Sequence, residues 1–368
     1  MKKSGAEKMS CVPYDHPAFD AHEEVAFFHD ATSGLRAMIA IHRHWRTASA
    51  GGCRVREYAS ADAALADLLR LSRGMSYKSV MAGVDFGGAK AVVMGPLPES
   101  GEARRAALLR IADWVNTFAG AFRTGVDFGL RSEDVAVMHE RTPYVVGLGA
   151  FDPAATTAHG VHEAILNAVR HRLDRNDLKG VRVAVQGLGK VGGALVDLLR
   201  ADGAAVVGAD TDVDRAAAAA RKGVRIVPVE IIHREEVEVF SPCAVGEILN
   251  AATIPELRAA VVAGAANNQL ARPEDGLALH RRGILYAPDY VANAGGLIAV
   301  AAELGEHDAA WIGRKMKALG RTLSHVFTVA AEKDIPTQEA ADDIALERIR
   351  ERDRRFGHNP RPQLAVQR

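Results

Sequence analysis

A glycine-rich turn between two regular segments is the feature that most constrains the fold of this chain. The apolar run 181–186 is typical of a short β-strand, and the alanine- and leucine-rich run 190–200 after the turn is typical of a helix. A second apolar run, 204–209, ends at Asp210. Strand, helix and strand in this order predict a βαβ unit, whose parallel strands are covered on both faces. Further strands of a doubly wound sheet are expected at 225–227, 238–240, 260–263 and 283–286.

The glycines of the turn have the spacing G-x-G-x-x-G. At this place Gly187 permits the tight turn, Gly189 lets a pyrophosphate approach the backbone, and Gly192 brings the helix against the sheet. The first helical N–H groups would bind the phosphates, and Asp210 would bind ribose hydroxyls and disfavour a 2′-phosphate, so NAD is expected over NADP. Arg215 weakens this preference, because a guanidinium could bind a 2′-phosphate. The predicted cofactor contacts here are Gly187, Leu188, Gly189, Lys190, Val191, Gly192 and Asp210.

Two lysines in the first half of the chain are candidate catalytic groups. Lys78 ends the run Arg-Gly-Met-Ser-Tyr-Lys and Lys90 ends Gly-Gly-Ala-Lys, in a chain where only 11 of the 46 Lys and Arg residues are lysines. A lysine can shift its pKa from ~10.4 toward neutrality when it is desolvated or set beside another cation. If the two share a pocket, Lys78 would bind a substrate carboxylate and favour a neutral Lys90, which could act as a base. The alternative is a pair of solvated surface lysines.

The region before residue 143 has the pattern of an α/β domain. A helix is expected from Ser60, its N-cap, to Gly74, its end, and this places Lys78 just past the helix. Runs 25–30 and 35–42 predict the two strands of a hairpin. The other elements expected here are a buried strand at 89–94 and an amphipathic helix at 102–118.

The length of 368 residues favours two domains with a cleft between them. A stretch rich in Gly, Pro and Ala, 143–160, keeps neither helical nor strand periodicity and predicts the boundary. We therefore expect an α/β fold of two domains. The first is a substrate-binding domain at 1–147, completed by 336–368, and the second is a Rossmann-type NAD-binding domain at 148–335.

Composition argues against several classes of function. The formal net charge is zero, which provides no basic surface for nucleic acid or a membrane, so a small-molecule partner is expected. The three cysteines, Cys11, Cys53 and Cys243, form no C-x-x-C pair, so no metal site is expected, and their small number suits the cytoplasm. The charged N-terminus leads into no apolar core, and no stretch reaches the ~18 apolar residues that span a bilayer. We expect a cytoplasmic protein.

Six short runs together resemble the glutamate/leucine/phenylalanine/valine dehydrogenase family, over residues from about 25 to about 351. Their order and spacing make chance agreement negligible. The resemblance implies an NAD-dependent amino-acid dehydrogenase that interconverts an amino acid with its 2-oxo acid and ammonia, assembled as a homo-oligomer. The runs are Gly51-Gly-Cys-Arg54, Leu71-Ser-Arg-Gly-Met-Ser-Tyr-Lys78, Ala82-Gly-Val-Asp-Phe-Gly-Gly-Ala-Lys90, Val185-Gln-Gly-Leu-Gly, Ala265-Ala-Asn-Asn-Gln269 and Ala287-Pro-Asp-Tyr-Val-Ala-Asn-Ala-Gly-Gly296.

The resemblance also implies roles for particular residues. Lys78 would bind the α-carboxylate or carbonyl of the amino acid, and Lys90 would activate water. The family's catalytic aspartate is matched by Asp127, and not by Asp134, because only the register of Asp127 continues without a gap through residues 139–147. Assigned through the resemblance alone are Asn293 at the polar end of the substrate, and Thr157, Cys243, Ala244 and Asn267 at the cofactor.

The same resemblance bears on the substrate. Family members that act on glutamate share a lysine just before the first Gly-Gly and a hydroxyl residue four places after the second, where this chain has Ala50 and Val300. A side-chain carboxylate buried there would lack a counter-charge, at a cost on the order of several kcal/mol, so an apolar substrate is expected. Amino acids with large aliphatic and with aromatic side chains are nearly equally favoured as substrates. Ala50 and Gly125 leave room in the side-chain pocket, while Leu297 narrows the pocket. The predicted substrate contacts are Ala50, Gly51, Met75, Lys78, Gly125, Asn293, Leu297 and Val300.

The chain departs from the family pattern at Ala89, where the family has glycine, and at Ser76, where it has threonine. These departures bear on rate and specificity more than on reaction type. One alternative is a relative that kept the fold and binds a nucleotide without catalysis, against which the complete set of candidate catalytic residues argues. Another is oxidation of a 2-hydroxy acid, which would need a histidine–arginine–aspartate set, and His139 and His159 have no such partners in the sequence.

Overall fold

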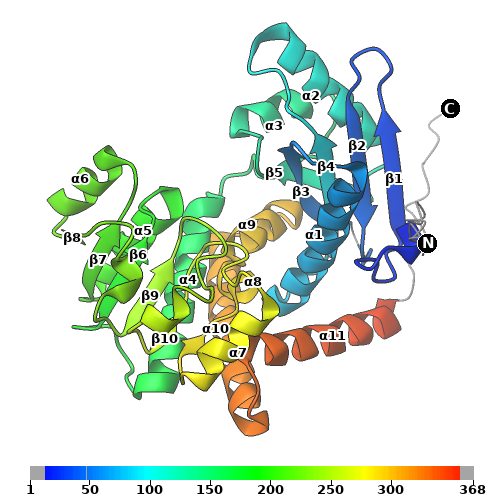
Figure 1. Cartoon of the computed structure of the whole chain (residues 1–368). Helices are drawn as coiled ribbons and strands as arrows, with labels where there is room; N and C mark the ends of the chain where they lie inside the picture. The colour runs from blue at the N-terminus through cyan, green and yellow to red at the C-terminus, as the bar shows by residue number, and fades with distance from the viewer. Residues whose placement is uncertain (1–12, 47, 357–368) are drawn as a thin grey trace, which may run out of the picture. The chain divides into compact units, whose positions relative to one another are not determined.

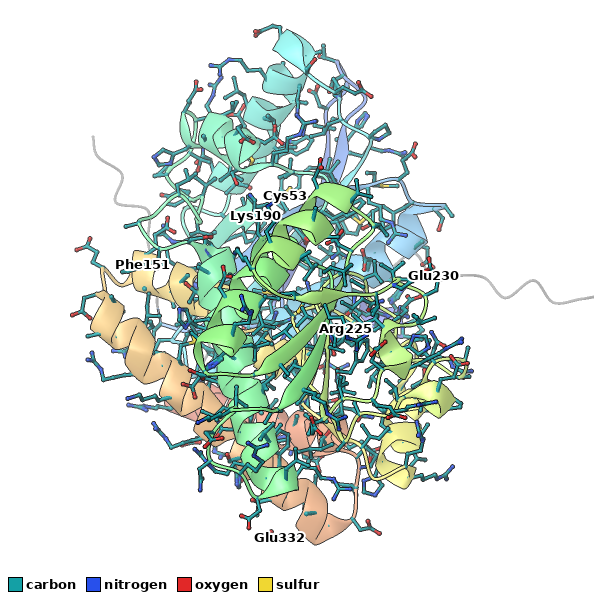
Figure 2. All side chains as sticks on the ribbon, turned by 90° about the vertical axis from the view of Figure 1, so that its left-hand side faces the viewer. Cys53, Phe151, Lys190, Arg225, Glu230 and Glu332 are labelled. Atoms are coloured by element: carbon teal, nitrogen blue, oxygen red, sulfur yellow. The ribbon has the colours of Figure 1, made fainter. Side chains whose placement is uncertain are left out.

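A computed structural model describes residues 13–46 and 48–356 (Figure 1), and their side chains are drawn in Figure 2, with Cys53 and Lys190 among those labelled. The contacts divide the chain into two compact units. Of the described residues, the first unit comprises 13–76, 85–148 and 352–356, and the second comprises 77–84 and 149–351. Residues 336–351, which the sequence analysis placed with the first unit, therefore group with the second.

The first unit is built on a five-stranded mixed sheet. Its strands are β1 (Glu24–His29), β2 (Arg36–Ile41), β3 (Ser49–Arg56), β4 (Gly87–Met94) and β5 (Phe122–Val126), in the order β1-β2-β4-β3-β5. β1 and β2 form the predicted antiparallel hairpin, with Gly34 at a φ of 72° in its turn. β2 pairs antiparallel with β4, whereas β3 lies between β4 and β5 and pairs parallel with both.

Helix α1 (Ala61–Ala82) is longer than the sequence predicted. Ser60 caps its start, where the hydroxyl accepts a backbone N–H at 3.0 Å. The helix continues through Gly74, so the expectation that Lys78 lies past a helix end is wrong, and Lys78 lies near the C-terminal end of α1. A glycine inside a helix costs only about 1 kcal/mol, which the burial of the following apolar residues offsets. The buried residues beyond Gly74 are Ser76, Tyr77, Ser79, Val80, Met81 and Ala82.

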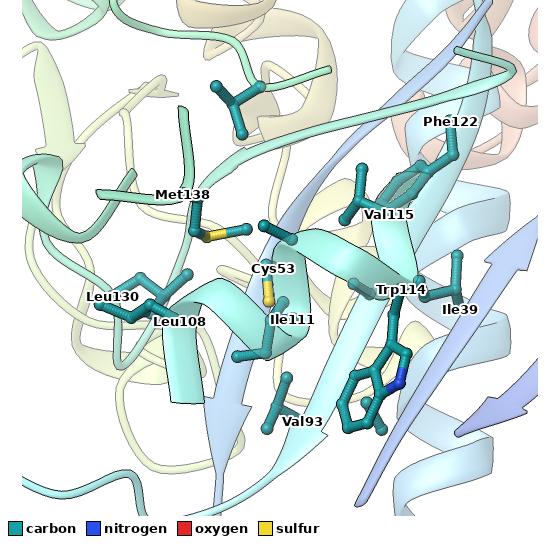
Figure 3. Close-up of a cluster of buried hydrophobic side chains, with 14 of the residues drawn as sticks. Ile39, Cys53, Val93, Leu108, Ile111, Trp114, Val115, Phe122, Leu130 and Met138 are labelled. Atoms are coloured by element: carbon teal, nitrogen blue, oxygen red, sulfur yellow. The ribbon is translucent and has the colours of Figure 1, made fainter. Parts of the chain in front are cut away.

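The two faces of this sheet pack against different helices. Helices α2 (Gly101–Asn116) and α3 (Ser132–His139) cover one face and form with it the main apolar core of the unit (Figure 3). Residues of α1 pack on the other face. Side chains alternate along a strand, so Ala89, Ala91 and Val93 of β4 enter the core under α2, while Val92 packs with α1.

The second unit is built on a six-stranded sheet in which every strand pair is parallel. The strands are β6 (Arg182–Gln186), β7 (Ala205–Ala209), β8 (Arg225–Ile226), β9 (Val239–Pro242), β10 (Val261–Val262) and β11 (Leu285–Tyr286). Their order is β11-β10-β9-β6-β7-β8. The predicted doubly wound parallel sheet is confirmed. The strand order reverses between β6 and β9, and such sheets bind ligands at this switch point.

Helices connect and cover the strands of the second unit. Helix α5 (Lys190–Ala201) joins β6 to β7, and α6 (Val213–Arg221) joins β7 to β8. Helix α4 (Pro153–Leu173) precedes β6 and packs against α5, α9 (Gly295–Leu304) and α10 (Ala309–Lys333). The remaining helices among the residues that the structure describes are α7 (Pro273–Arg281), α8 (Asp289–Ala292), α11 (Thr337–Phe356) and the short 3-10 helices η1 (Pro13–Asp15), η2 (Ile232–Arg234) and η3 (Ile254–Glu256).

The described residues contain neither a membrane-spanning helix nor a cluster of metal-binding side chains. None of their helices combines the length and the apolar character needed to cross a bilayer. None of their His, Cys, Asp and Glu side chains form a group of three or more that could hold a metal ion. Cys53 and Cys243 are free thiols, and Cys11 lies outside the described residues.

Candidate active-site and cofactor-binding residues

Lys90 lies on β4 with its side chain directed away from the main core. Its strand neighbours Ala89 and Ala91 both enter the core under α2, so alternation places Lys90 on the opposite face of the sheet. Only 8% of its side-chain surface is exposed. A buried ammonium is unfavourable unless another charge compensates it.

Asp127, the first residue after β5, provides that charge. Its Oδ2 forms an ion pair with Lys90 Nζ, and its Oδ1 accepts a hydrogen bond from the Phe128 backbone N–H at 2.7 Å. β3 lies between the strands that carry the pair. A Cβ atom on Gly52 of β3 would lie 2.8 Å from the Asp127 Cβ, closer than real contacts allow. The glycine therefore leaves the space in which the carboxylate lies.

Arg54 on β3 is a second cation that faces Asp127. Its Nε lies 3.5 Å from Asp127 Oδ2. Burial alone would raise the pKa of the Asp127 carboxyl, but the charges of Lys90 and Arg54 outweigh burial and hold this pKa below its ordinary value. Asp127 is therefore an anion at neutral pH, between two cations.

The matching runs alone indicate no role for Arg54, although this residue ends one of them. The sequence does contain one indication of a role for Arg54: Gly52 and Arg54 are two residues apart on a strand, so they lie on the same face of the sheet. Its partner across the sheet comes from a distant segment, however, and only the register of β3 against β5 shows that they meet. This register pairs Gly52 with Gly125 and Cys53 with Val126.

Asp134, the alternative to Asp127, has a structural role. Its carboxylate accepts two hydrogen bonds from the Arg104 guanidinium, at 2.6 and 2.8 Å, and one from the Arg131 backbone N–H at 2.7 Å. Asp134 belongs to α3 and Arg104 to α2, so this pair fastens one helix to the other. Of the two aspartates, Asp127 is the one that contacts Lys90.

Lys78 lies on the segment of α1 that belongs to the second unit, and it is half-buried. In this unit its charge acts on Asp289, the first residue of α8. Burial raises the pKa of the Asp289 carboxyl. The hydrogen bond from Gln269 N–H at 2.9 Å and the charge of Lys78 lower this pKa, but burial outweighs them. Asp289 lies in one of the matching runs and had no role in the sequence analysis.

The other predicted substrate contacts are distributed over both units, and the role of each stays a prediction. Asn293 is buried, and its amide donates to Ala265 O at 3.1 Å and to Asn267 Oδ1 at 2.8 Å. Its own Oδ1 has no hydrogen-bond partner among the described residues and could accept one from a ligand. In the first unit lie Ala50 and Gly51 on β3, Gly125 on β5 and Met75 on α1, and in the second lie Leu297 and Val300 on α9.

The three glycines of the turn after β6 differ in the space around them. Gly187 has a φ of 93°, and a Cβ there would lie 2.6 Å from the Ala244 Cβ. A Cβ on Gly192 would lie 1.8 Å from the Gly187 carbonyl oxygen. A Cβ on Gly189 would meet, within 4 Å, only Arg215 Nη1 at 3.7 Å, so the space above this residue is open. The fold requires the outer two glycines, and the middle one leaves room for a ligand.

The surroundings of this turn fit a dinucleotide. Lys190, labelled in Figure 2, begins α5, so the helix N-terminus with its free N–H groups lies at the turn. At the tip of β7, Asp210 accepts hydrogen bonds from Leu188 N–H at 2.6 Å and Asp212 N–H at 2.8 Å. Other predicted cofactor contacts are Cys243 and Ala244 directly after β9, Thr157 on α4, Val191 on α5 and Asn267 beside Asn293.

Known protein families match both halves of the chain. The family model described as Glu/Leu/Phe/Val dehydrogenase, dimerisation domain, matches residues 22–144. The model described as Glutamate/Leucine/Phenylalanine/Valine dehydrogenase matches residues 149–214 and 209–357.

Individual relatives are similar over nearly the whole chain. The phenylalanine dehydrogenase of Caldalkalibacillus thermarum (strain TA2.A1) is 41% identical over 359 residues, which cover 94% of this chain and 95% of the relative. The leucine dehydrogenase of Geobacillus stearothermophilus is 38% identical, covering 89% and 90%. The crystal structure of L-tryptophan dehydrogenase from Nostoc punctiforme is similar with a TM-score of 0.80 and 37% identity, covering 90% of this chain and 97% of that one.

Proposed function

Because this chain belongs to the glutamate/leucine/phenylalanine/valine dehydrogenase family and is therefore an amino-acid dehydrogenase, we propose that it catalyses reversible, NAD-dependent oxidative deamination of a hydrophobic L-amino acid to its 2-oxo acid and ammonia. The observation that carries the proposal is the ion pair between the buried Lys90 and the partly buried Asp127. An amine and a carboxylate in contact, away from bulk water, are suited to accept and return protons.

NAD would bind at the switch point between β6 and β9. The N–H groups at the start of α5 would bind the pyrophosphate over Gly189, where a Cβ would find open space. Asp210 would bind the ribose hydroxyls and repel a 2′-phosphate, which favours NAD over NADP. When bound, the nicotinamide supplies the hydride acceptor of the reaction. The further proposed contacts are Thr157, Gly187, Leu188, Lys190, Val191, Gly192, Cys243, Ala244 and Asn267.

Three residues would carry the remaining chemistry. Lys78 would bind the substrate carboxylate and hold Cα in place for loss of the hydride. Once its ammonium has passed a proton to Asp127, the neutral Lys90 amine would take a proton from the water that adds to the resulting iminium carbon. Asp127 would carry protons to and from the amine, so that ammonia can leave. The contact between Lys90 and Asp127 supports this division of roles, because protons pass readily between groups in direct contact.

The proposed substrate has a branched-chain or aromatic side chain. Relatives at 37–41% identity are named for phenylalanine, leucine and tryptophan. Ala50, which is 1% exposed, offers no charge to a second carboxylate, and Val300 on α9 offers no hydroxyl. The side-chain pocket is proposed to include Ala50, Gly51, Met75, Gly125, Asn293, Leu297 and Val300.

Assembly and location are also part of the proposal. The family model that matches residues 22–144 is described as a dimerisation domain, which supports a homo-oligomer. The free thiols Cys53 and Cys243 are typical of proteins in a reducing compartment, which supports the cytoplasm. The partners proposed are the amino acid, its 2-oxo acid, ammonia and NAD.

A substrate panel tests the function directly. The purified protein is mixed at alkaline pH with each proteinogenic L-amino acid and either NAD or NADP, and the absorbance of the reduced nicotinamide is followed. We expect reduction of NAD with large aliphatic or aromatic amino acids, and the reverse reaction with their 2-oxo acids and ammonia. A preference for glutamate would overturn the proposed substrate, and a preference for NADP the proposed cofactor. Calorimetric binding of NAD without turnover of any amino acid would indicate a binding-only relative.

A further inference from the structure

Arg54 lies between two carboxylates of the first unit. On one side its Nε is 3.5 Å from Asp127 Oδ2. On the other side its Nη1 donates to Asp67 Oδ2 at 3.2 Å and lies 3.5 Å from Asp67 Oδ1. Only 17% of the Arg54 side chain is exposed, so solvent screens these interactions less than it would at the surface.

Asp67 is itself held in place. It belongs to α1, and its Oδ2 accepts a hydrogen bond of 2.6 Å from the Tyr58 hydroxyl. One side of the Arg54 guanidinium is thus fixed to a helix, while its Nε is directed at Asp127. The Nε–Oδ2 distance is that of an ion pair and longer than a normal hydrogen bond, so Arg54 acts on Asp127 through its charge.

We propose that Arg54 is a positioning residue for the reaction: held by Asp67, its guanidinium fixes the Asp127 carboxylate against Lys90. The inference rests on the proposed function of Asp127 in proton transfer. Arg54 itself has no contact with the reacting atoms in this role. It keeps Asp127 in place and charged, while Asp127 stays accessible to a substrate amine.

The charged and titratable groups around Asp127 define what Arg54 contributes. Lys90 faces it from β4 and Arg54 faces it from β3, and the Phe128 N–H binds its Oδ1, while the Cys53 thiol between Gly52 and Arg54 belongs to the core on the other face of the sheet. Burial, with the charge of Asp127 as the second cause, raises the pKa of the Cys53 thiol to about 12, so the thiol is neutral. Two cations therefore offset the burial of Asp127. Without Arg54 the pKa of Asp127 would rise, and the carboxylate would take up a proton at a higher pH.

Three variants test the proposed role of Arg54, because they are expected to shift the acid midpoint of the kcat/KM profile in opposite directions. Arg54→Gln removes the charge, and the acid midpoint of the kcat/KM profile should rise by about one pH unit. Arg54→Lys keeps a charge without the planar fork and should give a smaller rise. Asp67→Asn keeps an oxygen that can accept from Arg54 Nη1 and hold the guanidinium, but removes the competing negative charge, so the charge of Arg54 acts on Asp127 alone and the midpoint should fall. A merely structural role would not give opposite shifts, because Arg54→Gln and Asp67→Asn break the same ion pair.

Arg104→Gln is the matched control. It also breaks an arginine–aspartate pair of the first unit, one that is buried and lies on the side of the sheet away from Lys90. We expect it to lower the melting temperature and to leave the acid midpoint unchanged. A shift of the midpoint as large as that of Arg54→Gln would overturn the proposal, since general loosening of the unit would then explain both.

The charge on Asp127 is also measured without turnover. Infrared titration of the carboxyl stretch of the full-length protein reports it, with Asp127→Asn identifying the band by difference. A carboxyl midpoint that stays in place in Arg54→Gln overturns the inference. If Arg54→Gln does not fold, the Asp67→Asn variant provides the test. A carboxyl midpoint of Asp127 that rises or does not move in Asp67→Asn overturns the inference. A carboxyl midpoint that moves as expected while the rate profile does not supports the role of Arg54 and overturns the proposed function of Asp127.

Discussion

Lys90 on β4 and Asp127 at the end of β5 form an ion pair across β3, the strand that lies between them. Gly52 is on β3, and because it has no side chain it leaves space beside this strand for the Asp127 side chain. An ion pair of this kind depends on the register of three strands and on one glycine, so it is sensitive to changes that touch neither partner.

Replacing Gly52 by alanine should lower activity. The new Cβ would lie 2.8 Å from the Asp127 Cβ and displace the carboxylate, which should reduce kcat/KM roughly 10- to 100-fold. Steady-state kinetics with the best amino acid measures the effect. Gly313→Ala in α10, where a Cβ would meet nothing within 4 Å, is the control and should stabilise the protein by about 0.5–1 kcal/mol at unchanged activity. If Gly52→Ala had the same kcat/KM as Gly313→Ala, the new Cβ at position 52 would not displace the Asp127 carboxylate.

Removing the Lys90 amine should separate catalysis from cofactor binding. We expect Lys90→Ala to abolish turnover, because no other group would take the proton from water. Binding of NAD, measured by calorimetry, should remain nearly intact, because Lys90 belongs to the first unit and the glycine turn to the second. A variant that lost affinity for NAD and kept its turnover at saturating NAD would show that the role given to Lys90 is wrong.

The middle and last glycines of the turn should respond differently to alanine. Gly192→Ala places a Cβ 1.8 Å from the Gly187 carbonyl oxygen and should lower the melting temperature. Gly189→Ala meets only the end of the Arg215 side chain and should fold normally, yet weaken NAD binding, since its methyl occupies the space over the turn. Thermal unfolding and calorimetry measure the two effects. If Gly189→Ala bound NAD with unchanged affinity, the pyrophosphate would not bind over Gly189.

Stability should fall in mild acid because of His22. Burial, with the neighbouring His42 as second cause, lowers the pKa of His22 to about 4. Unfolded His22 regains a pKa of about 6.5 and binds a proton that the folded chain does not, so stability is lost as the pH falls from about 6.5 to about 4, by up to about 3 kcal/mol. The pKa of buried His42 is lowered too, with the same sign.

Urea unfolding at a series of pH values measures this loss. His22→Gln should flatten the pH dependence over that window, whereas His29→Gln, at an exposed site at the end of β1, should keep it. If His22→Gln retained the full slope, the destabilisation would come from other groups.

A lysine at position 50 should change the substrate range. Ala50 is buried on β3, and an ammonium there would be placed in the proposed side-chain pocket without a counter-charge. We expect Ala50→Lys to lose activity on apolar amino acids in the substrate panel. Ala59→Lys, at an exposed alanine, controls for the substitution itself. Melting curves of both variants show whether they fold, and undiminished use of apolar substrates by a folded Ala50→Lys would mean that the pocket lies elsewhere.

The second sheet could be predicted from the sequence because its determinants are local. The apolar runs, the glycine turn and Asp210 occur within one continuous βαβ segment, and β6, α5 and β7 lie where the pattern predicted them. The hairpin of β1 and β2 was equally predictable, since its turn residues Ser33 and Gly34 act on their neighbours.

The rest depended on contacts between distant segments. Gly74 has the local propensity of a helix end, but the buried residues after it keep α1 helical. Arg54 meets Asp67 across the space between β3 and α1, and it meets Asp127 at the end of the neighbouring strand β5. No periodicity in one segment reveals such pairs, since strand register and helix placement together determine them.

Alternation along β4 also limits how this enzyme can evolve. Ala89 and Lys90 are adjacent but belong to opposite faces of the sheet, so a single-residue insertion or deletion between Gly87 and Lys90 would exchange them. The ammonium would then enter hydrocarbon, and a methyl group would replace it beside Asp127. Homologous chains are therefore free to vary by substitution here, while changes of length should be confined to the loops at either end of the strand.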